Sequence, residues 1–248
     1  MSILIVGAGH AGGTVAASLR QLGCDEPITI VGDEPYLPYQ RPPLSKAWLH
    51  GDFSFAAVGL RPQEFYDQRN IALRLDARVA AIDPAAQSAI LLSGESLSYR
   101  VLILATGARP RRMGIEGEDL PGVHALRSIA DADAIKAGLQ PGRRLVVIGG
   151  GYVGLEVAAS ARIHGMEVVV VEREARLMAR VASPILSDFV QKYHERQGVV
   201  FRLEAGVTGI ESASGSVRGV RLADGRSEPA DMVLVGIGAV PNVELAQA

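Results

Sequence analysis

The sequence has little cysteine, few aromatic residues and almost no net charge. Cys24 is its only cysteine, which excludes a disulfide framework and a cysteine-rich metal site and is typical of a reducing compartment. The formal net charge is −2 at pH 7, so nothing favours nucleic acid or an anionic membrane as a partner. No apolar run approaches the ~20 residues of a membrane-spanning helix. These features predict a cytoplasmic protein that binds neither nucleic acid nor membrane.

Glycine, in contrast, is plentiful, and two glycine clusters share one pattern. The chain has 28 glycines in 248 residues, a length that suffices for roughly two domains with their own cores. The segments ILIVGAGHAG (3–12) and LVVIGGGYVG (145–154) each place four apolar residues before G-x-G-x-x-G. One such motif is weak support for a nucleotide site, because glycine-rich turns are common. Two copies, each between an expected strand and an expected helix, predict a protein that holds two dinucleotides and moves electrons between them.

The residues around both motifs predict parallel sheets with helices between the strands. The first helix is expected at 11–22, ending at Gly23, and a later helix at 187–197. A small β-meander is expected at 79–99. Buried strands are expected at 3–6, 101–105 and 232–235, and further strands at 28–31, 219–222 and near 199–203. The sequence therefore predicts an α/β fold of two Rossmann-like, three-layer nucleotide-binding domains with β-meander insertions, related by internal duplication.

The glycines of the first motif are expected to have separate tasks. Gly7 permits the tight turn, Gly9 lets the backbone approach a pyrophosphate, and Gly12 lets the helix pack against the strand. Backbone N–H groups at the start of the helix then face the phosphates. Asp33, just past the second strand, suits an adenosine ribose. The alternative, that these glycines serve only helix–strand packing, explains less of the strand–helix–strand–acid pattern.

The second motif contains Gly149, Gly151 and Gly154, and Glu172 follows its second strand. A carboxylate there accepts hydrogen bonds from both ribose hydroxyls and repels a 2′-phosphate. Like-charge juxtaposition costs on the order of several kcal/mol, more than the ~1.4 kcal/mol that gives tenfold discrimination. NADH should therefore be preferred to NADPH. Arg173 either softens this preference or is a surface charge.

Three segments carry a resemblance to a known family. LPYQRPPLSKAWL (37–49), ATGARP (105–110) and GGGYVGLEVA (149–158) resemble the FAD-dependent, NADH-dependent ferredoxin reductases, the putidaredoxin reductase-like members of the pyridine nucleotide-disulfide oxidoreductase superfamily. The likeness runs along the whole chain, and RPPLSK with its flanks is close to diagnostic. It implies a flavoprotein oxidoreductase that passes electrons from NADH through FAD to a ferredoxin-type iron–sulfur protein serving a monooxygenase or dioxygenase.

The resemblance also implies which residues form the site. The first motif is expected to bind FAD and the second NADH. Lys46 falls at a lysine beside the flavin ring, and Glu156 at a carboxylate that pairs with it near flavin N5. An ammonium there stabilises negative charge on the reduced flavin, so these two are the expected catalytic residues. The other residues expected to bind a cofactor are Ala11, Arg41, Val79, Thr106, Gly107, Arg127, Tyr152, Val153 and Gly238.

The sequence disfavours disulfide and peroxide chemistry. Related flavoenzymes of those kinds place a reactive cysteine near the flavin, whereas here the proline-rich loop offers the hydroxyl of Ser45. Cys24 follows the first helix and is expected to be a bystander thiol. The five histidines show no metal-ligand spacing, so no metal is expected. Arg109, Arg111 and Arg112 either help to dock an acidic iron–sulfur protein or form a solvated face.

The expected domain boundaries follow the repeat. Residues 1–110 are expected to form the N-terminal part of the FAD domain, 111–242 the NADH domain, and 243–248 the start of a return to the FAD domain. Family members continue beyond this point, so the FAD domain is expected to be incomplete at its C-terminal side. Lys46 and Glu156 are then expected to lie in different domains and to tie them together.

Two other functions remain open from the sequence. One is a non-catalytic NADH-binding fragment whose flavin site stays empty. The other is a related flavin reductase whose acceptor is a rubredoxin or another electron carrier.

Overall fold

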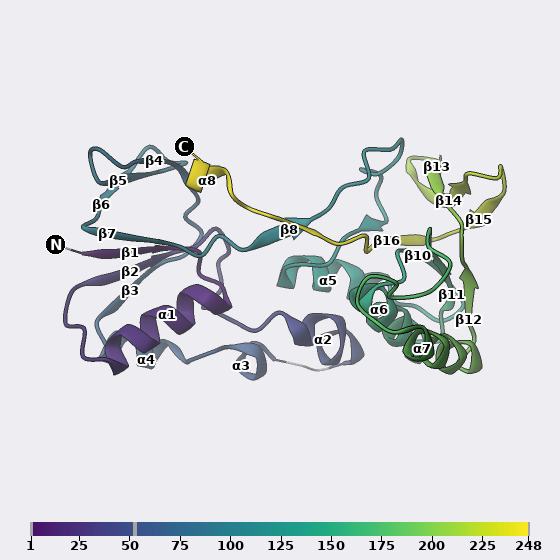
Figure 1. Cartoon of the computed structure of the whole chain (residues 1–248), viewed down its shortest axis with the longest axis horizontal. Helices are drawn as coiled ribbons and strands as arrows, with labels where there is room; N and C mark the ends of the chain where they lie inside the picture. Colours follow the sequence, from purple (N-terminus) through teal and green to yellow (C-terminus); the bar gives the residue numbers. More distant parts are fainter. Residues whose placement is uncertain (1, 52–53, 248) are drawn as a thin grey trace. The chain divides into compact units, whose positions relative to one another are not determined.

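The computed structural model describes residues 2–51 and 54–247, and the chain forms two compact units (Figure 1). The first unit comprises Met1–Arg41, Ser54–Arg109 and Val240–Ala248, and the second comprises Pro42–Phe53 and Pro110–Ala239. Of the expected closing segment 243–248, Ala248 lies outside the described residues. The second unit includes residues 42–53, which the repeat had assigned to the first domain, and this difference matters for the site below.

The first unit is built on a parallel sheet with the strand order β3-β2-β1-β7. Its strands are β1 (Ile3–Val6), β2 (Ile28–Val31), β3 (Ile71–Arg74) and β7 (Val101–Leu104). Alternate residues of β1 point to opposite faces. Ile3 and Ile5 pack with side chains of α1 (His10–Gln21) and α4 (Gln63–Gln68), whereas Leu4 and Val6 pack with the meander of β4 (Val79–Asp83), β5 (Ser88–Leu91) and β6 (Ser96–Ser98). The sheet therefore has helices on one face and the meander on the other.

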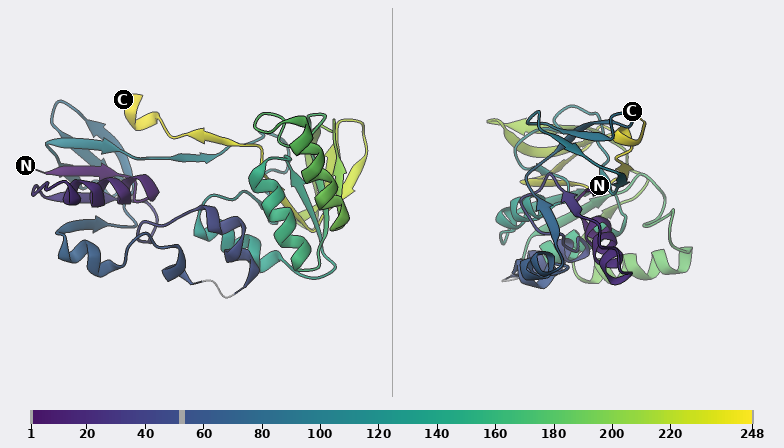
Figure 2. Two further views of the ribbon diagram at one scale, coloured as in Figure 1. Left: turned by 60° about the horizontal axis from the view of Figure 1, so that its bottom comes forward. Right: turned by 90° about the vertical axis from the view of Figure 1, so that its left-hand side faces the viewer.

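The second unit repeats this arrangement and adds one strand. Its parallel sheet has the order β12-β11-β10-β16-β9. The strands are β9 (Val123–His124), β10 (Arg144–Ile148), β11 (Glu167–Val171), β12 (Val199–Arg202) and β16 (Met232–Val235). The helices are α5 (Ile129–Gly138), α6 (Tyr152–Ile163) and α7 (Pro184–Arg196). Figure 2 shows α6 and α7 side by side on the sheet.

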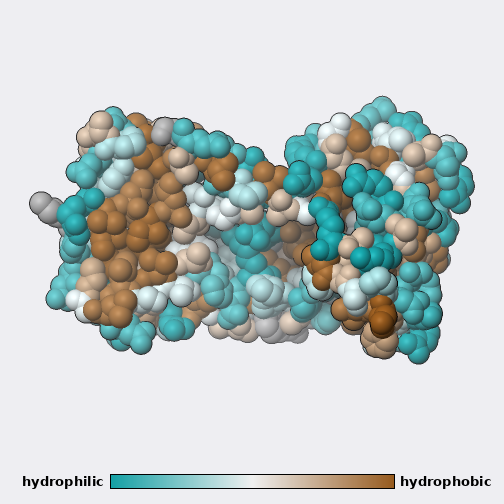
Figure 3. Space-filling model, in the orientation of Figure 1, coloured by the Kyte–Doolittle hydropathy of each residue, from teal (hydrophilic) through white to brown (hydrophobic). Residues whose placement is uncertain are grey.

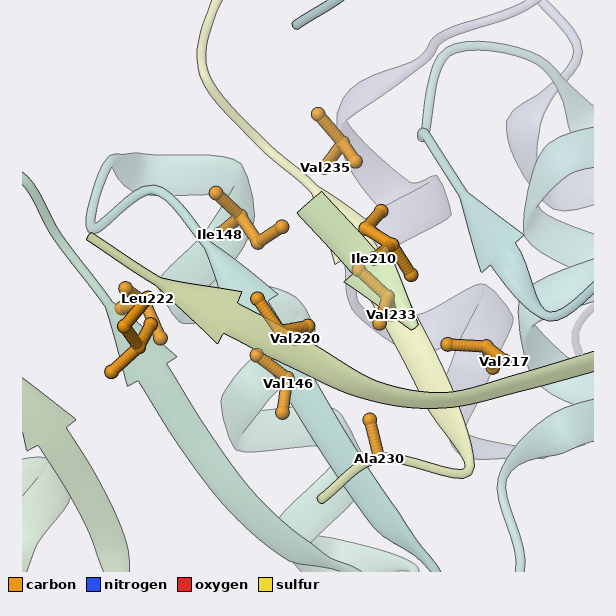
Figure 4. Close-up of a cluster of buried hydrophobic side chains, with 10 residues drawn as sticks. Val146, Ile148, Ile210, Val217, Val220, Leu222, Ala230, Val233 and Val235 are labelled. Atoms are coloured by element: carbon orange, nitrogen blue, oxygen red, sulfur yellow. The ribbon is translucent and has the colours of Figure 1, made fainter. Parts of the chain in front are cut away.

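The opposite face of the second sheet is covered by a meander of its own. It consists of β13 (Val207–Ala213), β14 (Ser216–Leu222) and β15 (Ser227–Pro229). Val146 and Val233 of the parallel sheet meet Ile210 and Val220 of the meander in one buried cluster (Figure 4). Burying four branched side chains of this size contributes roughly 1.5–3 kcal/mol each relative to exposure. This cluster holds the meander against the face of the parallel sheet.

The two units thus confirm the expected α/β class and the internal repeat. The strand order β3-β2-β1-β7 matches the order β12-β11-β10-β16. In each unit the meander comes directly before β7 or β16 in the sequence. Short strands β8 (Ala108–Pro110) and β17 (Ala239–Pro241) pair with each other where the chain passes between the units. The remaining short helices are η1 (Pro42–Ser45), α2 (Ala47–His50), α3 (Phe55–Val58) and α8 (Glu244–Gln247). No helix in the described part of the chain is long and apolar enough to cross a membrane.

β7 and β16 hold the same place in the two sheets but differ in burial. β16 lies between β10 and β9, and all four of its residues are buried. Within the described ranges β7 pairs only with β1 in its sheet, and none of its four apolar residues is fully buried. Leu104 is 37% exposed. Figure 3 shows apolar surface gathered over the strands of the first unit.

Candidate functional site

The two glycine motifs occupy equivalent positions in the two units. One connects β1 to α1 and the other connects β10 to α6 (Figure 1). We refer to Gly7–Gly12 as the first glycine turn and to Gly149–Gly154 as the second glycine turn. Each lies at the carboxyl end of the central strand of its sheet, where open α/β sheets bind ligands.

In the first glycine turn the three glycines have different surroundings. Gly7 has φ of +117°, a conformation that favours glycine, and a Cβ there would lie 2.1 Å from the carbonyl oxygen of Ala105. A Cβ on Gly12 would lie 1.9 Å from the carbonyl oxygen of Gly7. At Gly9, by contrast, no atom of the described chain lies within 4 Å of the added Cβ. The first and third glycines therefore permit close packing, and the second faces open space.

The second glycine turn repeats this geometry. Gly149 has φ of +106°, and its added Cβ would lie 2.5 Å from the carbonyl oxygen of Gly236. The Cβ of an alanine at position 154 would lie 2.3 Å from the carbonyl oxygen of Gly149. Above Gly151 the space is again open to 4 Å among the described residues. The tight turn expected at Gly7 and the close packing expected at Gly12 are therefore present, and the second glycine turn has the same geometry; contact of Gly9 or Gly151 with a pyrophosphate stays a prediction.

Both turns fit a dinucleotide pyrophosphate. The open space above Gly9 and Gly151 lies at a helix N-terminus, where free N–H groups and the helix dipole favour an anion. Neither α1 nor α6 has an acidic residue in its first turn, so no carboxylate there opposes a phosphate. Ala11, Tyr152 and Val153, expected at the site, lie in these first helical turns and are exposed.

Glu172 is held over the second glycine turn by backbone hydrogen bonds. Its Oε2 accepts the N–H of Gly150 at 2.6 Å, and its Oε1 accepts the N–H of Glu174 at 2.8 Å. A carboxylate oxygen can accept more than one hydrogen bond, so each oxygen retains capacity for a ribose hydroxyl. The carboxylate is therefore oriented before any nucleotide arrives.

Asp33 occupies the corresponding place after β2, in a more open setting. It is exposed and lines a surface hollow of about 660 Å³ together with Arg74, Ala77 and Arg78. Val79, expected to bind a cofactor, follows Arg78 in the chain and is only 7% exposed. Its side chain belongs to the core beneath the meander, so only its backbone is available to a ligand, and its role toward a cofactor stays a prediction.

Two further segments with expected site residues follow the equivalent strands β7 and β16. Gly107 and Gly238 both have positive φ, of +68° and +111°. Thr106 donates from Oγ1 to the carbonyl oxygen of Asn242 at 2.7 Å, and Asn242 returns a bond from Nδ2 to the carbonyl oxygen of Thr106 at 2.9 Å. In the second unit the carbonyl oxygen of Gly238 accepts the N–H of Arg111 at 2.9 Å. These residues shape the backbone beside the glycine turns.

Arg41 and Arg127 have partners within their own units. The guanidinium of Arg41 bonds Glu34 at 2.6 Å and the hydroxyl oxygen of Tyr39 at 3.0 Å. Arg127 is partly buried, and its backbone N–H donates to Asp131 Oδ2 at 3.0 Å, next to the cap of α5. Any role of either residue toward a cofactor stays a prediction.

Lys46 and Glu156 form an ion pair in the second unit. The distance from Lys46 Nζ to Glu156 Oε2 is 2.8 Å, and Lys46 Nζ also donates to the carbonyl oxygen of Pro42 at 3.1 Å. Ser45 donates from Oγ to the same Glu156 oxygen at 2.5 Å. Lys46 was expected in the first domain, whereas the structure groups Lys46 and Glu156 in the same compact unit; the expectation that the pair ties two domains together stays a prediction. The side chains of Lys46 and Glu156 are 49% and 30% exposed, as in a surface pair.

Residues 42–51, which we call the anchored segment, are held by a row of side chains on α6. Glu156, Ser160 and His164 recur every four residues and therefore share one helix face. Ser160 donates to the carbonyl oxygen of Ser45 at 2.9 Å and contacts His50 Nε2 at 2.9 Å. His164 Nε2 lies 2.6 Å from the carbonyl oxygen of Leu49.

Helix α5 holds the same segment from a second side. Trp48 Nε1 donates to Asp133 at 2.7 Å, and Lys136 bonds the carbonyl oxygen of Gly51. These contacts explain why the anchored segment groups with the second unit. Sequence reasoning did not identify Ser160, His164 or Asp133, although Glu156, Ser160 and His164 are spaced by four along α6 and its C-cap, which is a readable signal.

Two arginines of the run 109–112 are already paired with carboxylates. Arg109 lies 2.7 Å from Glu244, and Arg112 lies 2.5 Å from Asp119. Their charge is therefore partly neutralised within the chain, which favours the solvated-face interpretation over docking.

Two β–α–β units, each with a pyrophosphate-fitting glycine turn and a carboxylate after the next strand, define an α/β protein built for dinucleotides. The family model for pyridine nucleotide-disulphide oxidoreductases matches residues 1–248. The chain belongs to this family. It is 46% identical to the probable ferredoxin reductase CtmF of Castellaniella defragrans over 99% of this chain, and 43% identical to a rubredoxin-NAD(+) reductase of Pseudomonas putida, also over 99%.

A solved structure agrees with these relatives. Putidaredoxin reductase, in its covalent complex with putidaredoxin, superposes with a TM-score of 0.95 at 40% sequence identity, over 99% of this chain and 60% of that chain. The curated relatives are covered over 60% and 64% of their length. The chain thus spans about three fifths of the proteins it resembles.

Proposed function

We propose that this chain is the nucleotide-binding part of a flavoprotein oxidoreductase that passes electrons from NADH through FAD to a small iron–sulfur protein of the ferredoxin type, serving a monooxygenase or dioxygenase. The observation that carries the proposal is the repeated glycine turn, open above its second glycine and followed by a carboxylate in both units. Membership of the family and the relative named as a ferredoxin reductase support it.

The proposal assigns FAD to the first unit and NADH to the second. In the first unit Gly9 and Ala11 would receive the FAD pyrophosphate and Asp33 the adenosine ribose. In the second unit Gly151 and the first turn of α6 would receive the NADH pyrophosphate, and Glu172 the ribose hydroxyls. FAD held in the first unit would supply the redox chemistry, which takes up a hydride from NADH and passes on single electrons.

The Lys46 ammonium would supply the positive charge expected beside the flavin ring, and Glu156 would orient it. The Lys46 ammonium contacts Glu156 and the carbonyl oxygen of Pro42. The Ser45 hydroxyl donates to Glu156 and so helps to hold the carboxylate. A fixed cation stabilises negative charge that develops nearby during reaction, at no cost of reorganisation. Arg41, Thr106, Gly107, Arg127 and Gly238 complete the proposed cofactor contacts.

A second acceptor is supported by a specific relative. A chain with 43% identity to this one is named a rubredoxin-NAD(+) reductase, so rubredoxin is the alternative to ferredoxin. Purified ferredoxin and rubredoxin, offered to the same NADH-reduced protein, distinguish the two acceptors. The proposal also places the protein in the cytoplasm, where its single cysteine, Cys24, stays reduced.

The test is spectroscopic and uses a matched variant. The chain incubated with FAD should acquire flavin absorbance that NADH bleaches, and a chain that binds NADH yet stays colourless would instead support the non-catalytic fragment. Glu172→Ala should weaken NADH binding at least about tenfold and narrow the gap to NADPH, because it removes the hydroxyl acceptor and the repulsion together. Glu167→Ala, at the other end of β11, serves as the control. An unchanged NADH/NADPH ratio in Glu172→Ala would refute the ribose assignment.

A further inference from the structure

The three residues after β11 form a charged group with an internal ion pair. Glu172 is part-buried and its carboxylate is tied to backbone N–H groups, as described above. Arg173 is 81% exposed at its side chain, and its Nη2 lies 3.2 Å from Oε1 of Glu174, which is 47% exposed. The N–H of Glu174 in turn donates to Glu172 Oε1 at 2.8 Å. The three residues therefore act as one loop with two negative charges and one positive charge.

The position of Arg173 matters for which nucleotide the second unit accepts. NADP(H) differs from NAD(H) by a phosphate on the ribose 2′-oxygen, next to the place proposed for Glu172. A guanidinium is well suited to such a phosphate because its planar set of donors matches the phosphate oxygens. Arg173, the neighbour of Glu172 in the chain, is the nearest candidate in this loop. Its partner Glu174 offers the guanidinium a carboxylate in place of the phosphate.

We propose that Glu174 is a second specificity-determining residue, which excludes 2′-phosphorylated dinucleotides by holding Arg173. This inference rests on the proposed function, in which the second unit binds the pyridine nucleotide. Glu172 acts directly, through its hydrogen bonds to the ribose and its repulsion of the phosphate. Glu174 acts through Arg173, whose guanidinium it holds.

The two carboxylates are expected to oppose the 2′-phosphate in different ways: Glu172 repels it, and Glu174 occupies the guanidinium that would otherwise bind it. Removing Glu172 alone removes its own repulsion of the phosphate but leaves Glu174 to pair with Arg173, so only part of the possible gain in NADP⁺ affinity should appear. Removing both carboxylates leaves one free cation in the loop, and NADP⁺ binding should improve strongly. Because the Arg173–Glu174 pair is exposed, its interaction is modest and sensitive to salt. The expected gain from freeing Arg173 is therefore about three- to fivefold in affinity at low ionic strength.

The experiment measures the affinities of NAD⁺ and NADP⁺ for the whole chain by calorimetry, which avoids turnover. Glu174→Gln should raise NADP⁺ affinity about threefold or more and change NAD⁺ affinity much less. Glu172→Ala with Glu174→Gln should exceed Glu172→Ala in NADP⁺ affinity by the same factor, and Arg173→Ala added to that pair should abolish the gain. Glu167→Gln is the matched control, because it breaks another exposed pair of β11, with Arg144 at 2.9 Å.

The outcomes separate this inference from the proposed function. If Glu174→Gln leaves the NADP⁺/NAD⁺ ratio unchanged in both backgrounds, or if the gain survives loss of Arg173, the inference is overturned while Glu172 keeps its role. If Glu167→Gln gives the same gain, the effect is one of overall charge and the inference is equally overturned. If the unaltered chain binds neither nucleotide, the proposed function itself fails.

Discussion

Two glycines three residues apart in the second glycine turn should separate binding from stability when each is changed to alanine. Gly154→Ala adds a methyl carbon 2.3 Å from the carbonyl oxygen of Gly149 and 3.0 Å from Val147 Cγ1. Backbone cannot move aside as a side chain can, so α6 must shift. Gly151→Ala adds its methyl to open space, and the backbone there is extended at φ −86° and ψ 179°, which any residue adopts.

The expected magnitudes follow from these surroundings. Overpacking costs about 1–3 kcal/mol, and the upper part of this range applies to Gly154→Ala because the closest atom belongs to the backbone. Alanine's better helix propensity offsets about 1 kcal/mol, which leaves a loss of about 1–2 kcal/mol and a fall in Tm of about 2–8 °C for a chain of this size. At the helix cap, Gly151→Ala should cost under about 1 kcal/mol. It should nevertheless weaken NAD⁺ binding about tenfold or more, because the methyl occupies the path of the pyrophosphate.

The assay pairs thermal unfolding with NAD⁺ titration on the same preparations. Gly151→Ala should lose affinity while it keeps its Tm, and Gly154→Ala should lose Tm. If Gly151→Ala binds NAD⁺ as tightly as the unaltered chain, the open space above that glycine does not receive the pyrophosphate. If Gly154→Ala unfolds at the unaltered temperature, the close helix packing inferred from the geometry does not limit the fold. Gly9 and Gly12 offer the same comparison for FAD.

Three further outcomes are expected. In the holoenzyme, Lys46→Ala combined with Glu156→Ala should slow flavin reduction by NADH much less than the sum of the single changes. The coupling in unfolding free energy should stay below about 1 kcal/mol, because both side chains are partly exposed. Strictly additive effects on the rate would show that the two residues do not act as one unit. Amide hydrogens of β7 should exchange faster than those of β16, measured by mass spectrometry, because β16 is buried between two neighbours; equal protection would contradict the difference in burial. Burial lowers the pKa of His194 in the folded chain, so as pH falls through about 6.5 the imidazole is protonated in the unfolded chain before it is protonated in the folded chain. The free energy of unfolding measured in urea should therefore decline in this range and level off below the folded-state pKa. His194→Gln should reduce that decline.

Much of the fold could be predicted because its signals are local. β1, β2 and β16 have the predicted bounds, since short β-branched runs before a glycine turn indicate buried parallel strands. Other elements were missed. β3 is only four residues long and partly exposed, which gives no clear pattern, and α4 is equally short. Helix α5 did carry a signal, because Ser128 and Asp131 form the capping box at its start.

The site was predictable where it depends on backbone geometry and less so where it depends on tertiary contacts. The spacing of the glycines specifies their roles, and Glu172 follows its strand as any ribose-binding carboxylate would. No local signal shows to which unit the anchored segment belongs. Its place is decided by contacts with Ser160, His164 and Asp133, which lie far along the chain. The partners of Arg41 likewise depend on how Glu34 and Tyr39 fold against it.

Helix α6 connects the nucleotide turn with the charged pair. Its N-terminus forms the second glycine turn, Glu156 follows within about two helical turns, and Ser160 and His164 hold the anchored segment further along the same face. At 1.5 Å of rise per residue, Gly151 and Glu156 are separated by about 7.5 Å along the helix axis. A shift of α6 that reoriented the nucleotide phosphates would therefore move the carboxylate that holds Lys46 by the same amount. Helix α6 thus carries both the expected NADH phosphate site at its N-terminus and the carboxylate that pairs with Lys46.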